Sequence, residues 1–114
     1  MKTRLAVALV VFGAFGLATA AKAEEWKDVP IVDAHCAGDV KADPDSHARS
    51  CDLQCAHYGF GMIASDGTYL KFDMAGNSKA KAALQSSTKK DHIRATVDGV
   101  RSGNTIKVKS IELS

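Results

Sequence analysis

The sequence predicts a mainly β fold with one or two helices: a small five-stranded barrel in which a helix bearing Cys and His residues is inserted between the first two strands. Three observations support this α+β class. Apolar and polar residues alternate near the C-terminus with the period of half-buried strands. Glycine-containing turn signals join the later strands into two hairpins. Apolar residues at helical spacing occur only in short stretches.

Residues 26–35 are predicted to form the first strand. Pro30 has no N–H to donate to a neighbouring strand, so this strand either starts near Ile31 or lies at an edge there. Asp43-Pro44 then offers a helix cap followed by proline at the first helical position. We expect a helix of about three turns that stops at Gly59.

The first predicted hairpin comprises residues 60–65 and 68–73, which flank Asp66-Gly67, a strong signal for a type I′ turn. Residues 75–88 carry apolar side chains at helical spacing, and Ser78 could cap a short helix there. An ordered loop is the alternative for this stretch.

The second predicted hairpin is the clearer one. Ile93, Ala95 and Val97 alternate with polar residues, and residues 102–104 form a turn signal. Beyond the turn Ile106 and Val108 alternate with polar residues, but the next apolar residues are Ile111 and Leu113, one position out of that alternation. Because a slip of one moves side chains to the opposite face, we expect a bulge near Lys109-Ser110.

This order of elements matches a small Greek-key barrel of the oligonucleotide/oligosaccharide-binding (OB) type. Three motifs carry a resemblance: Trp26…Asp33-x-x-Cys36, Cys51-x-x-x-Cys55 and Val97-x-Gly99…Asn104-Thr-Ile-Lys-Val108. With them the chain resembles a group of small secreted bacterial domains that have an OB-like barrel and no settled function. The resemblance spans most of residues 26–112. It implies a fold and an exported protein, and it supplies no activity.

The N-terminus has the three-part pattern of a secretory signal peptide. A basic start, residues 1–4, precedes a 16-residue apolar run, residues 5–20, and small residues around Ala23 offer a cleavage site. A membrane-spanning helix needs about 20 apolar residues. We therefore expect a signal peptide over residues 1–23, a single domain over residues 24–114 with no membrane span, and a periplasmic or secreted location.

Charge argues against nucleic acid as a partner. The full chain has 15 basic and 13 acidic residues, and residues 1–23 contain three of the basic ones. Without them 12 basic residues face 13 acidic ones, a net charge of −1. No basic footprint remains, and no other partner is indicated. A domain this small has a thin core, which a disulfide or a metal ion would supplement.

Cysteine and histidine residues gather in the segment after the first strand. The candidate metal ligands are Cys36, His47, Cys51 and Cys55, with His35 or His57 as alternatives to His47. Thiolates spaced four apart can bracket one ion, and a Cys₃His set would accept zinc or copper(I). The cofactor is otherwise undetermined. Four aspartates also lie in this region: Asp39, Asp43, Asp45 and Asp52. They lack the spacing of a calcium-binding loop, and we expect them to form a solvated acidic loop.

Two other uses of the cysteines stay open. A structural disulfide would join Cys36 to Cys51 or Cys55, because residues four apart on a helix have Cβ atoms about 5–6 Å apart and a disulfide needs about 3.5–4.5 Å. Alternatively, Cys51 and Cys55 would cycle in a periplasmic thiol redox or copper-handling protein. No catalytic motif is evident. The sequence therefore favours a non-enzymatic exported binding domain that holds a soft metal ion or is stapled by a disulfide.

Overall fold

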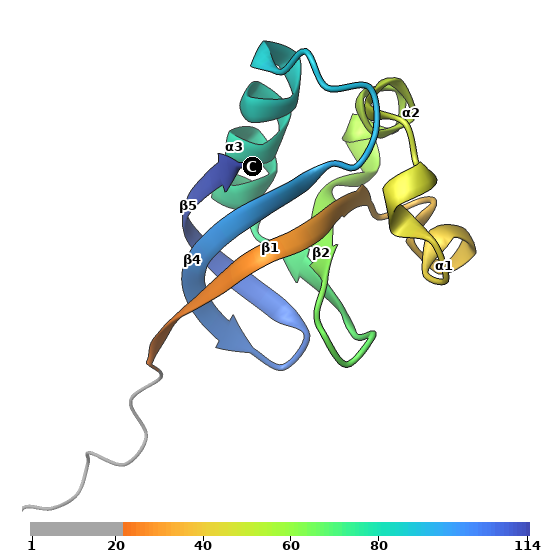
Figure 1. Ribbon diagram of the computed structural model, residues 1–114. Coiled ribbons are helices and arrows are strands. Elements are labelled where there is room, and N and C mark those ends of the chain that lie inside the picture. The colour runs from red at the N-terminus through yellow and green to blue at the C-terminus, as the bar shows by residue number, and fades with distance from the viewer. Residues whose placement is uncertain (1–21) are drawn as a thin grey trace, which may run out of the picture.

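A computed structural model describes residues 22–114 as a closed five-stranded barrel in the order β1-β2-β3-β5-β4 (Figure 1). The predicted small, mainly β, OB-like fold is confirmed. The predicted signal peptide lies outside the described residues except for Lys22 and Ala23. Within the described part, no helix has the length and apolar character needed to cross a membrane. The strands are β1 (Ala23–Asp33), β2 (Phe60–Ile63), β3 (Tyr69–Phe72), β4 (Arg94–Ser102) and β5 (Thr105–Leu113).

The helices are short and fall in two places. Between β1 and β2 lie α1 (Ala37–Val40), the 3₁₀ turn η2 (Pro44–Ser46), α2 (Arg49–Gln54) and the 3₁₀ turn η3 (Ala56–Tyr58). We call this segment, residues 34–59, the insertion. The longer α3 (Met74–Ser86) connects β3 to β4. In Figure 1 the insertion gathers at the C-terminal end of β1, while α3 lies beside β5.

Strand β1 is longer than predicted and passes through Pro30. Its first part pairs with β4, and its last three residues, from Ile31, pair with β2. Of the two alternatives for Pro30, a strand start near Ile31 was wrong, whereas an edge position is right. Pairing with β2 begins only at Ile31, so Pro30 has a strand neighbour on one side only. Pro30 lies opposite Arg94, just after a register shift between Trp26 and Val29, and the next N–H, of Ile31, donates to Ile93 O at 2.9 Å.

Both predicted hairpins are present. The loop between β2 and β3 is closed by hydrogen bonds from Gly67 N to Ala64 O (2.8 Å) and from Ala64 N to Thr68 O (2.9 Å). Only Gly67 in this loop has a positive φ, of 87°. A type I′ turn needs positive φ at both central residues, so the predicted turn type was wrong although the hairpin is right.

The predicted bulge in the second hairpin is confirmed. Asp98 pairs with Ser110 and Gly99 pairs with Val108, which leaves Lys109 without an opposite residue. The extra residue absorbs the one-position slip of the apolar pattern, so both halves of β5 keep their apolar side chains toward the barrel interior.

Helix α3 begins four residues earlier than the predicted cap at Ser78, and the loop alternative is excluded. Asp73 is the cap: its Oδ1 accepts from Gly76 N at 2.9 Å and also from Val108 N at 3.2 Å. One carboxylate therefore fixes both the start of the helix and its position against β5. Ala80 and Leu84 are fully buried against the barrel core.

The end of β1 is buried on both faces. Ile31 belongs to the main barrel core, whereas Val32 belongs to a smaller cluster with Ala37 and Ile63 that α1 covers. Alternation along the strand therefore directs Asp33 to the same face as Ile31, at the mouth of the barrel beneath the insertion.

The single helix of about three turns predicted before Gly59 is instead broken. His47 and Ala48 are extended, with ψ of 124° and 145°, and separate η2 from α2. Asp43 makes no side-chain cap. The predicted stop at Gly59, which has φ of 89°, is confirmed. The break matters because it removes the helical spacing between His47 and Cys51, whereas Cys51 and Cys55 keep theirs.

Close packing at Gly76 generates a prediction. A Cβ there would lie 2.5 Å from Val108 Cγ2 and 2.8 Å from Phe72 Cβ, whereas a Cβ at Gly38 would meet nothing within 4 Å. Gly76→Ala is therefore expected to lower the free energy of unfolding by about 1–3 kcal/mol. Gly38→Ala, the matched control, should change it by less than about 0.5 kcal/mol. Urea denaturation of both variants measures this, and equal stabilities would contradict the described packing of α3.

Candidate functional site

Asp33, the last residue of β1, is a fully buried acidic residue. Its Oδ2 accepts a hydrogen bond from Cys36 N at 2.9 Å, and its Oδ1 lies 2.9 Å from His47 Nε2. Its own N–H donates to Asp52 Oδ1 at 3.0 Å. These contacts connect the end of the strand to three separate positions of the insertion.

Asp52 on α2 is equally buried, with no exposed surface. The expectation that it belongs to a solvated acidic loop was therefore wrong. Its Oδ1 accepts from Asp33 N and lies 3.3 Å from His47 Nε2. Its Oδ2 is buried and has no hydrogen-bond partner among the described residues.

His47 completes the buried group because the backbone is extended at this residue. Its side chain is only 8% exposed, and its Nε2 lies between the two carboxyl groups. Two arginines hold the flanking residues in place. Arg94 on β4 makes a two-pronged ion pair with Asp45, at 2.9 and 3.1 Å. Arg49 donates to Leu84 O at 3.1 Å and to the Lys89 carbonyl at 2.7 Å.

Cys36 lies at the turn between β1 and α1 and is half-buried. One ligand atom each from Asp33, Cys36 and His47 lies within 4.8 Å of the other two. Burial, the neighbouring Asp33 carboxylate and the thiol of Cys55 raise the pKa of Cys36 to about 11. In the metal-free protein this sulfur therefore remains a thiol at neutral pH.

The four predicted ligands are divided between two environments. Cys36 and His47 lie together in the group with Asp33. Cys51 is exposed on α2, and Cys55 is half-buried where that helix ends. All three cysteines are free thiols. The sequence reasoning included the exposed thiol and missed Asp33, although Asp33 was part of the Asp-x-x-Cys motif that it singled out.

The two buried carboxyl groups have opposite pKa shifts. Burial is the largest influence on Asp52, and with the nearby Asp33 it raises the pKa to about 8. Burial acts on Asp33 in the same direction. The hydrogen bonds that Asp33 makes with His47, Cys36 N and Asp52 outweigh it and hold its pKa below 3.8. The opposite directions of these shifts make Asp52 the more readily protonated of the two carboxyl groups and Asp33 the more readily ionised.

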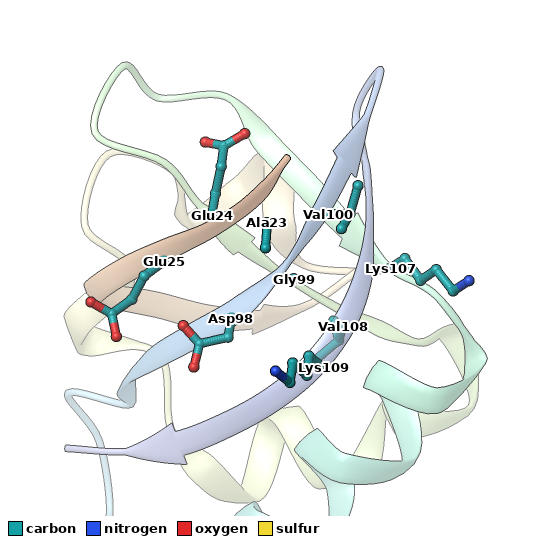
Figure 2. A pocket seen from close by; sticks show the side chains of 9 residues that line it. All are labelled: Ala23, Glu24, Glu25, Asp98, Gly99, Val100, Lys107, Val108 and Lys109. Atoms are coloured by element: carbon teal, nitrogen blue, oxygen red, sulfur yellow. The ribbon is translucent and has the colours of Figure 1, made fainter. Parts of the chain in front are cut away.

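A separate concavity lies at the other end of β1. It has a volume of about 670 Å³ and is bordered by the first residues of β1 and by β4 and β5 around Gly99 (Figure 2). Its rim carries Glu24, Glu25 and Asp98 as well as Lys107 and Lys109. Mixed charges of this kind select neither anions nor cations. Glu25, the last β1 residue that borders it, lies eight positions before Asp33, roughly 25 Å along the strand.

Comparison of the chain with protein-family models, curated proteins and solved structures gives no match. The fold and the site thus define the class of protein: a small OB-like barrel that carries an Asp–Cys–His group, with the aspartate fully buried, at one end.

The unequal protonation of the carboxyl pair predicts unequal effects of substitution. Asp33→Asn removes the carboxylate that accepts from Cys36 N and His47, and should lower the free energy of unfolding by about 2–4 kcal/mol. Asp52→Asn keeps a neutral group at this position and should not lower it at pH 7. Denaturant titration in the presence of a chelator measures both. Equal losses would show that the proton is not on Asp52.

The same pair predicts a pH dependence. A carboxyl group whose folded pKa of about 8 exceeds the ordinary 3.8 binds its proton more tightly in the folded state. Its contribution to stability is therefore complete below about pH 4 and is lost as pH rises to about 8. We expect Asp52→Asn to gain stability relative to the wild-type protein across this window, in thermal unfolding with chelator present. Parallel pH profiles would contradict the raised pKa.

Proposed function

We propose that this chain is an exported, non-enzymatic binding domain that holds one Zn²⁺ ion through Asp33, Cys36 and His47. The observation that carries the proposal is the convergence of a carboxylate, a thiol and an imidazole within 4.8 Å of one another, on three segments that the barrel holds in place. Each of these groups is an established ligand of zinc.

The spacing of the donor atoms fits a tetrahedral ion after a small adjustment. Zinc bonds of about 2.0–2.3 Å place neighbouring donors roughly 3.3–3.8 Å apart. Asp33 Oδ1 and His47 Nε2 are 2.9 Å apart, and the three donors all lie within 4.8 Å. Loading therefore requires movements of about 1 Å and the loss of the proton on the Cys36 thiol.

The ligand types favour zinc over copper(I). The sequence suggested three thiolates, a soft set suited to either metal. In the structure Cys51 is exposed outside the group, and a hard carboxylate, Asp33, is inside it. A mixed oxygen, sulfur and nitrogen set suits Zn²⁺ and is a poor one for Cu(I). The fourth position would fall to water.

The surroundings of the three ligands support the proposal. Asp52 contacts both Asp33 and His47, as groups behind metal ligands commonly do to orient them. Its buried Oδ2 has no partner among the described residues. A bound cation beside it would offset the cost of burying that oxygen.

Thiol cycling between Cys51 and Cys55, the alternative function, has less support. The two residues are joined by a helical hydrogen bond from Cys55 N to Cys51 O at 3.1 Å. This backbone geometry keeps their Cβ atoms about 5–6 Å apart, beyond the reach of an unstrained disulfide.

Two cysteine variants test the proposal. Cys36→Ser should weaken zinc binding at least tenfold, because the thiolate ligand is lost. Cys51→Ser, the matched control on an exposed thiol, should leave it unchanged. Competition against a chromogenic zinc chelator measures the affinities, and a thiolate-to-cobalt charge-transfer band in the Co²⁺ form identifies the sulfur. Equal losses in both variants, or no zinc binding by the reduced wild-type protein, would exclude this site.

A further inference from the structure

The segments that leave β1 and enter β2 continue to run side by side beyond the sheet. Ala34 N donates to Gly59 O at 2.9 Å, directly after the pair of Asp33 with Phe60. One residue further, the ring of His35 stacks on Tyr58 with centroids 4.5 Å apart. The next residue on the first segment is Cys36, and the turn before Tyr58 begins at Cys55.

Cys36 and Cys55 both lie at the end of this paired segment. Both residues are half-buried, and the Cys55 thiol is near enough to contribute to the raised pKa of Cys36. Tyr58 N donates to Cys55 O at 3.0 Å, which fixes Cys55 against the same turn. Cys51, one helical turn earlier, is exposed and takes no part. Of the three cysteines, these two are therefore the pair that a small movement can join.

From this geometry we propose that Cys36 and Cys55 form a reversible disulfide that excludes the metal ion, so that oxidation releases Zn²⁺ and reduction restores the site. The inference rests on the proposed zinc site, because the Cys36 sulfur would serve both as a zinc ligand and as one half of the disulfide. A sulfur bonded to Cys55 is no longer a thiolate and cannot ligate zinc. Conversely, a zinc-bound Cys36 is withheld from thiol exchange.

The chemical step needs an external disulfide such as oxidised glutathione. The Cys55 thiolate attacks one glutathione sulfur, which forms a mixed disulfide and releases the first glutathione thiolate. The Cys36 thiol then gives up its proton and its sulfur attacks the Cys55 sulfur, which closes the protein disulfide and releases the second glutathione thiolate. Two electrons pass to glutathione, and the two thiol protons pass to solvent or to the departing thiolates.

Because zinc binding and the Cys36–Cys55 disulfide exclude each other, each disfavours the other to the same degree. Zinc at a concentration one hundred times its dissociation constant should disfavour the disulfide by about a hundredfold, because only the reduced protein binds the ion. The exported location predicted for this chain is an oxidising compartment, where disulfides persist. There the zinc-bound form and the disulfide form would compete.

The test treats the purified wild-type protein with oxidised glutathione, with and without zinc, and maps disulfides by mass spectrometry of peptides. We expect a Cys36–Cys55 bond in the metal-free protein, slower formation with zinc, and release of zinc from the loaded protein to a chromogenic chelator. Cys55→Ser should bind zinc when reduced and keep it under the same oxidation. Cys51→Ser should behave as the wild type.

The outcomes separate this inference from the proposed function. Zinc binding by the reduced protein without a Cys36–Cys55 bond, or with zinc retained after the bond forms, overturns the inference and leaves the zinc site intact. A Cys36–Cys55 bond in a protein that binds no zinc when reduced overturns both the zinc site and its redox control. A bond that maps to Cys51 overturns the proposed pairing.

Discussion

The arrangement of the insertion depends on a buried carboxylate at the end of a strand. Asp33 has no exposed surface, and a charge in that position is costly unless donors surround it. Its two oxygens meet Cys36 N and His47 Nε2, each at 2.9 Å. Both donors come from the insertion, which must therefore fold back over the mouth of the barrel. The irregular path between β1 and β2 follows from that requirement.

The barrel in turn fixes the insertion through two arginines that flank His47. Arg94 extends from β4 to Asp45, whose pKa its hydrogen bond and charge hold low. Arg49 donates to carbonyl groups at the end of α3 and just beyond it. These contacts lie two residues on either side of His47, so the imidazole is positioned by elements that belong to the barrel. A loop held at only one end would not bring it between two buried carboxyl groups.

Sequence reasoning predicted the parts of this protein whose geometry is local. The hairpins and the bulge at Lys109 follow from the alternation of neighbouring residues, and the structure confirms them. The helix break at His47 could not be predicted in this way. It depends on contacts between residues 14 and 19 positions apart, Asp33 with His47 and with Asp52, which override the helical preference of the segment. Aspartate is usually exposed, so nothing in its spacing identified a buried pair.

Stability alone does not account for the composition of this group. A network that served only to hold the insertion would satisfy every buried polar atom, yet Asp52 Oδ2 is buried without a partner among the described residues. An unsatisfied buried oxygen costs about 1–3 kcal/mol, a large fraction of the stability of a domain of this size. Asp52 also holds its proton to about pH 8 only because it is buried beside another carboxyl group. Carboxylate, thiolate and imidazole are the donor types that bind zinc. On the proposal made above, the metal-free network would be the protonated form of a zinc site.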